Sequence, residues 1–208
     1  MAAIPLKHEV YYPESDGQPM GETDQHITEI LELISILRER YRNAADVYVG
    51  GDMLLYYVEG DPSQRVCPDV FLTFGIPKKP PRRSYFLWQE GRPPSLVVEV
   101  TSKGSRHEDV EKKDLYARLG VEEYFLHDPL GEYLKPSLQG FRLEDGKYLP
   151  IQPAIDSSLM SRLTGLTLRR EEEGLRLVDT QSGAPLLKPS EAYAALARLR
   201  RQLEQDSK

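Results

Sequence analysis

The 208-residue sequence has a single cysteine, Cys67, no long apolar run and no excess of basic residues. One cysteine excludes an internal disulfide and a structural zinc site built from several cysteines, which is typical of the reducing cytoplasm. No apolar run approaches the roughly 18 residues that a membrane span needs. The first residues also lack the basic and apolar segments of a secretion signal. We therefore expect a cytoplasmic protein without membrane contact.

The formal net charge is −6, although 29% of the residues are charged. A protein that holds nucleic acid by its overall field is usually basic, so contact with phosphates here requires a local basic patch or a bound metal ion. The charge therefore disfavours a simple nucleic-acid-binding module more than it disfavours a metal-dependent enzyme. The hydrophobic content of 39% is sufficient for a core in one domain with an appendage.

The residue pattern divides the chain into three parts. Residues 1–22 are rich in Pro, Gly, Tyr and acids and predict an irregular arm. Residues 23–180 alternate between helical and strand-like patterns, and 181–208 contain an Ala- and Arg-rich helix that begins near Ser190. Hairpins are expected over 131–180, with turns at Asp145-Gly146 and Glu173-Gly174.

The central region predicts an α/β (α+β) fold with a mixed sheet flanked by helices. A helix is expected over about 24–42, with Thr23 or Asp24 as its N-cap, and a second helix over 106–119 that ends at Gly120. The apolar stripe of the first helix comprises Ile27, Ile30, Leu31, Ile34, Leu37 and Tyr41. Strand-like segments rich in β-branched and aromatic residues occupy 47–61, 66–75, 96–102 and 121–129. The strand-helix-strand order over 96–126 indicates a crossover unit.

Two acids occur where an apolar strand is expected. Glu99 lies inside the run LVVEV, and Asp69 opens the run DVFLTF. Side chains on adjacent strands in register lie about 5 Å apart, so these carboxylates would repel each other unless a cation lies between them. Mg²⁺ suits such a pair, because it binds one or two carboxylates and keeps sites for water and substrate phosphate. A structural ion pair is the alternative for Glu99, and a turn cap is the alternative for Asp69.

A hydrolytic site also needs a group that orients or deprotonates water and a cation near the developing charge. Glu108, Lys112 and Tyr116 follow one another at four-residue steps, so they share one helical face. If that face packs at the strand ends, Lys112 reaches the metal site. The alternative for Lys112 and Glu108 is a solvent-exposed helix pair.

The order of these residues resembles that of the Uma2 family, restriction-endonuclease-like proteins of the PD-(D/E)xK nuclease superfamily. After Pro68-Asp69 and Glu99, the resemblance includes a series of polar, glycine and aromatic positions: Ser102, Lys112, Tyr116, Gly120, Glu123-Tyr124 and Asp128-Pro129. It covers roughly residues 24–140. It implies a restriction-endonuclease-like core and a Mg²⁺-dependent phosphodiesterase site.

The sequence departs from the superfamily at the lysine of the (D/E)xK signature, where Thr101 stands. The resemblance suggests that the lysine has moved to the following helix, as Lys112. Lys103 and Lys113 are rivals, because Lys103 is four residues past Glu99 and Lys113 is adjacent to Lys112. If no lysine reaches the metal, the domain is a catalytically inactive relative.

The resemblance also implies accessory residues. The first helix of nucleases in this superfamily often adds an acid, so Glu29 is the candidate, with Glu32 as its alternative. His26 and Glu29 are neighbours at the helix start, where solvated residues are also common. Ser102, Glu108 and Tyr116 are further accessory candidates. Ser102 is expected to make a phosphate contact or a backbone hydrogen bond, Glu108 shares the helical face of Lys112, and Tyr116 is expected to make a hydroxyl hydrogen bond near the site.

A basic cluster, Lys78, Lys79, Arg82 and Arg83, lies in a proline-rich segment over 75–94 that is expected to be a loop. One interpretation is a solvated charge run. The other is a nucleic-acid-binding loop beside the active site, which would supply positive charge to an otherwise acidic chain.

The favoured hypothesis is a Mg²⁺-dependent DNA endonuclease, with Mn²⁺ as a substitute metal. Asp69 and Glu99 would hold the metal, Lys112 would orient water and stabilise the phosphate, and superfamily analogy implies a 5′-phosphate product. An RNA-directed or repair nuclease and a catalytically inactive regulatory or nucleic-acid-binding protein are the alternatives. A homodimer is expected, because two sites cut two strands and the helix over 190–205 has Leu and Ala on one side.

Overall fold

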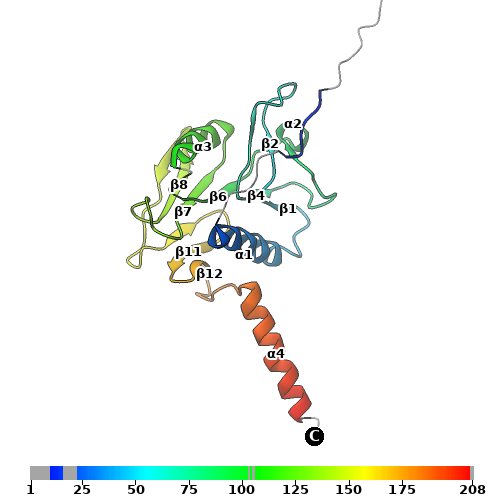
Figure 1. The fold of residues 1–208 in the computed structure, drawn as a ribbon, viewed down its shortest axis with the longest axis vertical. Helices are drawn as coiled ribbons and strands as arrows, with labels where there is room; N and C mark the ends of the chain where they lie inside the picture. The colour runs from blue at the N-terminus through cyan, green and yellow to red at the C-terminus, as the bar shows by residue number, and fades with distance from the viewer. Residues whose placement is uncertain (1–9, 16–22, 103, 105, 207–208) are drawn as a thin grey trace, which may run out of the picture.

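The computed structural model describes residues 10–15, 23–102, 104 and 106–206 (Figure 1). The main sheet has six strands in the order β1-β4-β6-β7-β8-β9. Their bounds are Val47–Gly50 for β1, Val70–Phe74 for β4, Leu96–Val100 for β6, Glu123–His127 for β7, Leu138–Glu144 for β8 and Lys147–Pro150 for β9. The helices are α1 (Asp24–Arg40), α2 (Leu87–Glu90), α3 (Arg106–Leu119) and α4 (Pro189–Asp206).

The main sheet is mixed, as the sequence predicts. β6 and β7 are parallel and are joined by α3, whereas the other neighbouring pairs are antiparallel. Every residue of β6 and β7 is buried, because helices and strands cover both faces of this central pair. The predicted class, a mixed sheet flanked by helices with C-terminal strands and a terminal helix, is confirmed.

Two small sheets complete the fold. One contains β2 (Leu55–Tyr56), β3 (Arg65–Val66) and β5 (Tyr85–Phe86), and the other contains β10 (Leu159–Ser161), β11 (Leu166–Glu171) and β12 (Gly174–Asp179). The segment 75–94, expected to be a loop throughout, therefore includes β5 and the single helical turn of α2. Tyr85 is fully buried in the core against Phe71, which explains why this segment is ordered.

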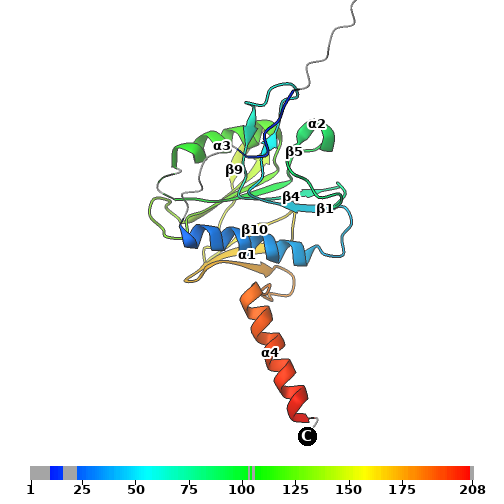
Figure 2. The ribbon, with the colours of Figure 1, turned by 45° about the vertical axis from the view of Figure 1, so that its right-hand side comes forward.

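The main sheet has a hydrophobic core on each face. On one face, α1 and the β10–β12 sheet pack against side chains such as Val70, Val98 and Phe125. On the other face, α3 packs through Tyr116 against Val97 and its neighbours. Figure 2 shows α1 and α3 on opposite sides of the sheet, with α4 extending away from both.

The buried face of α1 differs from the predicted stripe. Ile27 and Leu31 are 36% and 59% exposed, whereas the buried positions are His26, Glu29, Leu33, Ile36 and Leu37. Two polar residues thus enter the interior at the start of the helix. Thr23 is the N-cap, and its side chain accepts a hydrogen bond from the His26 backbone N–H, one of the two predicted caps.

The two predicted hairpins are present. Asp145 and Gly146 connect β8 and β9 with positive φ at both residues, which is the geometry of a type I′ turn. The second turn lies one residue earlier than predicted, because Glu171 pairs with Gly174 and leaves Glu172-Glu173 as the connection. The division into an arm over 1–22, a domain over 23–180 and a helical region over 181–208 stays a prediction, and most of the arm lies outside the described residues. None of the helices in the described residues combines the length and apolarity needed to cross a membrane.

Candidate active site

Asp69 and Glu99 face each other across an antiparallel strand pair. Val70 pairs with Val98, so continuing the register by one residue places Asp69 opposite Glu99. Glu99 is 1% exposed. Burial and the nearby Glu99 carboxylate raise the pKa of Asp69 well above its ordinary value. The two acids therefore form the mutually repelling pair that the sequence predicts.

Glu99 has a different hydrogen-bond donor at each carboxylate oxygen. Lys112 Nζ donates to Oε2 over 2.8 Å, and the Tyr116 hydroxyl donates to Oε1 over 2.6 Å. Both donors come from α3, which crosses the sheet next to β6. Tyr116 is fully buried, and burial followed by the Glu99 charge raises the pKa of its hydroxyl. Glu99 is thus a compensated buried carboxylate with a fixed orientation.

Among the lysines that the structure describes, Lys112 is the one that binds Glu99, and its charge also interacts with Asp69. Burial lowers the pKa of its ammonium, but the charges of Glu99 and Asp69 outweigh burial and leave the pKa raised. The ammonium also donates to the Cys67 backbone carbonyl over 3.3 Å. The rival Lys113 points elsewhere, because its Nζ lies 3.4 Å from the centroid of the Phe141 ring. Lys103, the other rival, lies outside the described residues.

A second polar cluster lies next to this site and was missed by sequence reasoning. The hydroxyls of Thr101 and Tyr133 both donate to Asp109 Oδ2. Burial raises the pKa of Asp109 to about 6, and the Glu99 charge also raises it. Thr101, which stands at the signature lysine position, therefore binds the start of α3 to the end of β6. This contact helps to fix the position of Lys112, three residues after Asp109.

His26 lies near Asp69, whereas the contacts of Glu29 are with β12 and His127. His26 Nε2 lies 3.8 Å from Asp69 Oδ2. The Glu29 carboxylate instead accepts a hydrogen bond from the Leu175 backbone N–H and lies 3.8 Å from His127 Nε2. The role of Glu29 as an accessory acid stays a prediction, and its carboxylate packs against the start of β12.

The other accessory candidates have separate locations. Glu32, the alternative to Glu29, forms an ion pair with Lys188 over 2.8 Å. Glu108 lines a cleft beside Lys112 and contributes to its raised pKa. Ser102 is half-buried directly after Thr101. Of these, Glu108 is the one whose charge acts on Lys112.

Two motif residues of the family resemblance have structural partners. Glu123 is buried and accepts hydrogen bonds from Arg142 and from the Ser161 hydroxyl. Asp128 is also buried, and one oxygen accepts from the backbone N–H groups of Tyr133 and Leu134. These acids hold the β7–β8 region and the turn that carries Tyr133.

The basic cluster does not form a free positive surface beside the acids. Lys78 donates to the carbonyls of Tyr41 and Arg42 at the end of α1. The Arg82 guanidinium pairs with Glu90 at 2.5 Å. Both cations are therefore bound within the protein. The segment that carries them leaves β4 at the end opposite Asp69. The nucleic-acid-binding role of the cluster stays a prediction.

The remaining two residues of that cluster lie on the surface. Arg83 pairs with Glu14 at 2.9 Å on the surface, and Lys79 is exposed. The segment that carries them returns to the body through β5, which pairs with β2.

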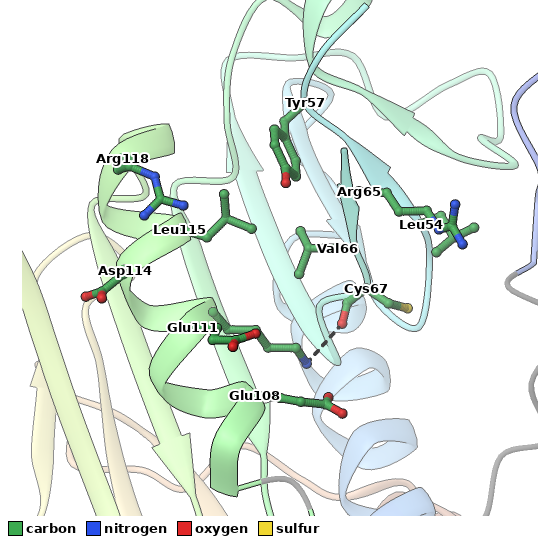
Figure 3. Close-up of a pocket in the computed structure, with 11 residues that line it drawn as sticks. Leu54, Tyr57, Arg65, Val66, Cys67, Glu108, Glu111, Asp114, Leu115 and Arg118 are labelled. Atoms are coloured by element: carbon green, nitrogen blue, oxygen red, sulfur yellow. Dashed lines mark hydrogen bonds between the residues drawn. The ribbon is translucent and has the colours of Figure 1, made fainter. Parts of the chain in front are cut away.

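A cleft of about 660 Å³ opens beside Lys112 (Figure 3). Its walls are α3 and the segment that contains β2 and β3. Tyr57, Val66 and Leu115 point into the space between these walls, and Arg118 lies on the α3 side (Figure 3). The cleft therefore leads to the ammonium that binds Glu99.

Cys67 also lines the cleft but is a poor nucleophile. Burial, and next the charge of Asp52, raise the pKa of its thiol to about 12. A thiol with that pKa is almost entirely protonated at neutral pH, whereas thiol enzymes use the thiolate. Thiol chemistry at this position is disfavoured.

The donor chemistry of the site fits magnesium. The described residues contain no group of three or more His, Cys, Asp or Glu side chains arranged for a metal ion. A pair of carboxylates is nevertheless the protein contribution that Mg²⁺ commonly takes, because it retains waters and binds substrate oxygens. The raised pKa of Asp69 reflects negative charge that a cation would relieve.

A family model and a solved structure are similar to this chain. The model of the family described as "Uma2: Putative restriction endonuclease" matches residues 6–171. A solved structure described as a "putative nuclease belonging to DUF820", from Anabaena variabilis, is similar with a TM-score of 0.49 and 15% sequence identity. That alignment covers 70% of this chain and 76% of the other. No curated protein gave a match.

Proposed function

The chain belongs to the Uma2 family, and we propose that it is a Mg²⁺-dependent nuclease that hydrolyses phosphodiester bonds in DNA. The observation that carries the proposal is the convergence of Asp69, Glu99 and Lys112 beside an open cleft. Two acids and a cation from separate elements supply the minimum set for metal-assisted phosphate chemistry.

Asp69 and Glu99 would hold the metal ion, which when bound supplies Lewis acidity toward the phosphate and acidifies a water molecule. Tyr116 keeps Glu99 in one orientation by its 2.6 Å hydrogen bond. The Val100 backbone N–H donates to Asp69 Oδ2 over 2.8 Å and orients the second acid. The protein thus presents preoriented carboxylates and avoids reorganisation during the reaction.

Lys112 acts as a cation in this proposal. Its raised pKa keeps the ammonium protonated at neutral pH, so it stabilises negative charge on the phosphate and donates a hydrogen bond to the attacking water. The same property disfavours Lys112 as a general base, since a base must lose its proton near the working pH. In-line attack at phosphorus would leave a 5′-phosphate by analogy with the superfamily.

The test is nicking of supercoiled plasmid by purified protein with Mg²⁺, Mn²⁺ or EDTA. We expect nicking with either metal, none with EDTA, and a loss of at least 100-fold in Glu99→Gln and Lys112→Met. Lys113→Met is the matched control, because it removes the neighbouring charge from a side chain that contacts Phe141. Equal loss in both lysine variants would contradict the role of Lys112.

Failure of the folded parent protein to nick plasmid would be followed by single-stranded DNA and RNA with both metals. Cleavage of RNA alone would show that the substrate is RNA instead of DNA. If all substrates remained intact, the hydrolytic proposal would be wrong, and a catalytically inactive regulatory or nucleic-acid-binding protein would be the better interpretation.

We also propose that two copies pair through α4. The helix projects from the body (Figures 1 and 2) and carries an exposed apolar stripe of Tyr193, Leu196, Leu199 and Leu203. With Ala192, the three leucines follow the four-three-four spacing of a coiled-coil seam. The start of α4 is fixed to its own body, because Arg176 pairs with Glu191 at 2.8 Å.

We propose an antiparallel arrangement of the two helices. In that register Leu196 would face the partner's Leu199, and Arg200 would lie near the partner's Tyr193, where cation–π attraction is favourable. A seam of this length gives an interface below the roughly 1,200 Å² of stable complexes, so the expected dimer is weak and depends on concentration.

A further inference from the structure

We propose that the cleft beside Lys112 binds one unpaired nucleotide, so that the preferred substrate is a single strand or a splayed end instead of a continuous duplex. The inference rests on the proposed function for the location of the bond that is cut. It follows from the size, the lining and the charge of the cleft.

The size and position of the cleft suit a single nucleotide. Its volume of about 660 Å³ lies within the range of about 300–1,000 Å³ that small-molecule sites occupy. Lys112 lines one part and binds Glu99 over 2.8 Å. Arg118 lies six residues further along α3, about 9 Å along the helix axis. A phosphate at Lys112 and a second phosphate at Arg118 would place the intervening base in the cleft.

The lining supplies a surface for a base. Tyr57 is half-buried, and its ring projects toward Val66 and Leu115 (Figure 3). Aromatic rings that stand in a groove stack on unpaired bases without sequence preference. Aliphatic side chains such as Leu115 complete the apolar environment that a base enters when it leaves the stack. A paired base inside a duplex does not expose its faces to such a ring.

The charges of the cleft favour a base over a row of phosphates. Three cations, Arg65, Lys112 and Arg118, are matched by three acids, Glu108, Glu111 and Asp114. A duplex is held by a surface with excess positive charge, which this cleft lacks. The acids can accept hydrogen bonds from amino groups on a base edge, as carboxylates do with cytosine.

Two residues of the basic cluster are engaged elsewhere. Lys78 and Arg82 use their charges in contacts with α1 and Glu90. Lys79 and Arg83, the other two, do not line the cleft. The cleft itself therefore lacks the excess positive charge that would favour a duplex.

The test is fluorescence anisotropy with a labelled 15-nucleotide single strand and with the blunt duplex of the same sequence. Binding is measured in Glu99→Gln with Mg²⁺ present, so that cleavage does not obscure it. We expect the single strand to bind at least fivefold more tightly than the duplex. Adding Tyr57→Leu should weaken single-strand binding about tenfold, the loss of one base stack, whereas Tyr57→Phe should stay within twofold.

Tyr11→Leu is the matched control, because Tyr11 is an exposed tyrosine that does not line the cleft, so its loss should leave binding unchanged. Equal affinity for duplex and single strand, or no effect of Tyr57→Leu, would overturn the inference. Plasmid nicking by the parent protein reports separately on the proposed function. If the parent protein nicks plasmid and Tyr57→Leu binds normally, the cleft is not a base site but the proposed nuclease function is supported. If binding depends on Tyr57 and no nicking occurs, the base-binding cleft is supported and the hydrolytic function is contradicted.

Discussion

The Lys112 ammonium lies 2.8 Å from Glu99 Oε2, with the two side chains 20% and 2% exposed. The pair therefore stabilises the protein only as long as both members are present. Removal of one member from a buried pair leaves an uncompensated charge or an unused donor, which costs more than loss of the pair itself.

A double-mutant cycle should show this coupling. Lys112→Met is expected to lower the free energy of unfolding by about 3 kcal/mol, because Glu99 loses its counter-ion. The double variant Glu99→Gln/Lys112→Met should recover at least about 1 kcal/mol of that loss. Urea unfolding at pH 7.5 measures all four proteins. Simple additivity of the two single losses would contradict a coupled pair.

Tyr116→Phe should reduce both stability and cleavage. The change removes the hydroxyl that donates to Glu99 Oε1 but keeps the ring packed on Tyr124, so a loss of about 1–2 kcal/mol is expected. Tyr148→Phe is the matched control, since its hydroxyl donates to the Val121 carbonyl over 2.8 Å. Both variants should lose stability, but only Tyr116→Phe should slow plasmid nicking. A similar nicking rate in the two variants would show that the Tyr116 hydroxyl has no functional role.

Asp109 should make stability depend on pH in a defined window. Its pKa is raised from 3.8 to about 6 in the folded protein, so the folded state binds this proton more tightly than the unfolded state. The contribution to stability is therefore full below about pH 4 and is lost as the pH rises through 6. Relative to Asp109→Asn, the parent should lose on the order of 1 kcal/mol between pH 4 and pH 7.

Asp114→Asn is the control for the Asp109 experiment, because it removes one acid from an exposed position on the same helix. Its change in stability between pH 4 and pH 7 is the baseline against which the effect of Asp109→Asn is measured. Thermal unfolding monitored by circular dichroism at several pH values measures both variants. A constant difference between the parent and Asp109→Asn would contradict the shifted pKa.

The sequence alone was sufficient to predict the elements that have strong local signals. The buried run of β6, the Asp145-Gly146 turn and the N-cap Thr23 each follow from residue type at one place in the chain. The opposition of Asp69 and Glu99 was also predictable, because an acid in an apolar strand needs a nearby partner. These predictions depend on short-range chemistry, which a single sequence records.

The contacts that the sequence did not predict depend on how the elements dock. Glu108 and Asp109 are adjacent acids in the first turn of α3, and only the rotation of the docked helix decides that Asp109 faces Thr101. Neighbouring helical positions differ by about 100° around the axis. The internal pairing of Arg82 was likewise invisible, because its partner Glu90 is positioned by the turn after β5.

Gly174→Ala should destabilise the protein strongly. A Cβ there would lie 1.7 Å from Glu29 Oε1, and the residue has φ of +110°. We expect a loss of more than about 2 kcal/mol. Gly183→Ala is the control for positive φ alone, because φ is +69° there and a Cβ meets open space. Equal losses in thermal unfolding would contradict the close packing of Glu29 on β12.

Glu29→Gln should retain plasmid nicking within about twofold. The amide oxygen can still accept from the Leu175 backbone N–H, and the side chain is directed against β12 instead of Asp69. Nicking at several Mg²⁺ concentrations measures the effect. A higher Mg²⁺ requirement in this variant would restore Glu29 as a member of the metal site.

Leu199→Glu should prevent pairing through α4. A charge in the apolar seam would be buried at the proposed interface, so the weak dimer should become a monomer at all concentrations. Ala194→Glu is the control, because this position lies outside the seam. Sedimentation velocity over a 100-fold concentration range measures both variants. A monomeric parent throughout that range would contradict the proposed dimer.

The strand register that brings Asp69 opposite Glu99 also restricts how the chain can fold. A shift of one residue between β4 and β6 would send the two carboxylates to opposite faces of the sheet. One of them would then enter the apolar layer beneath α1, far from the ammonium on α3, at a large cost in desolvation. The carboxylates proposed for catalysis thus also disfavour every other register of β4 and β6.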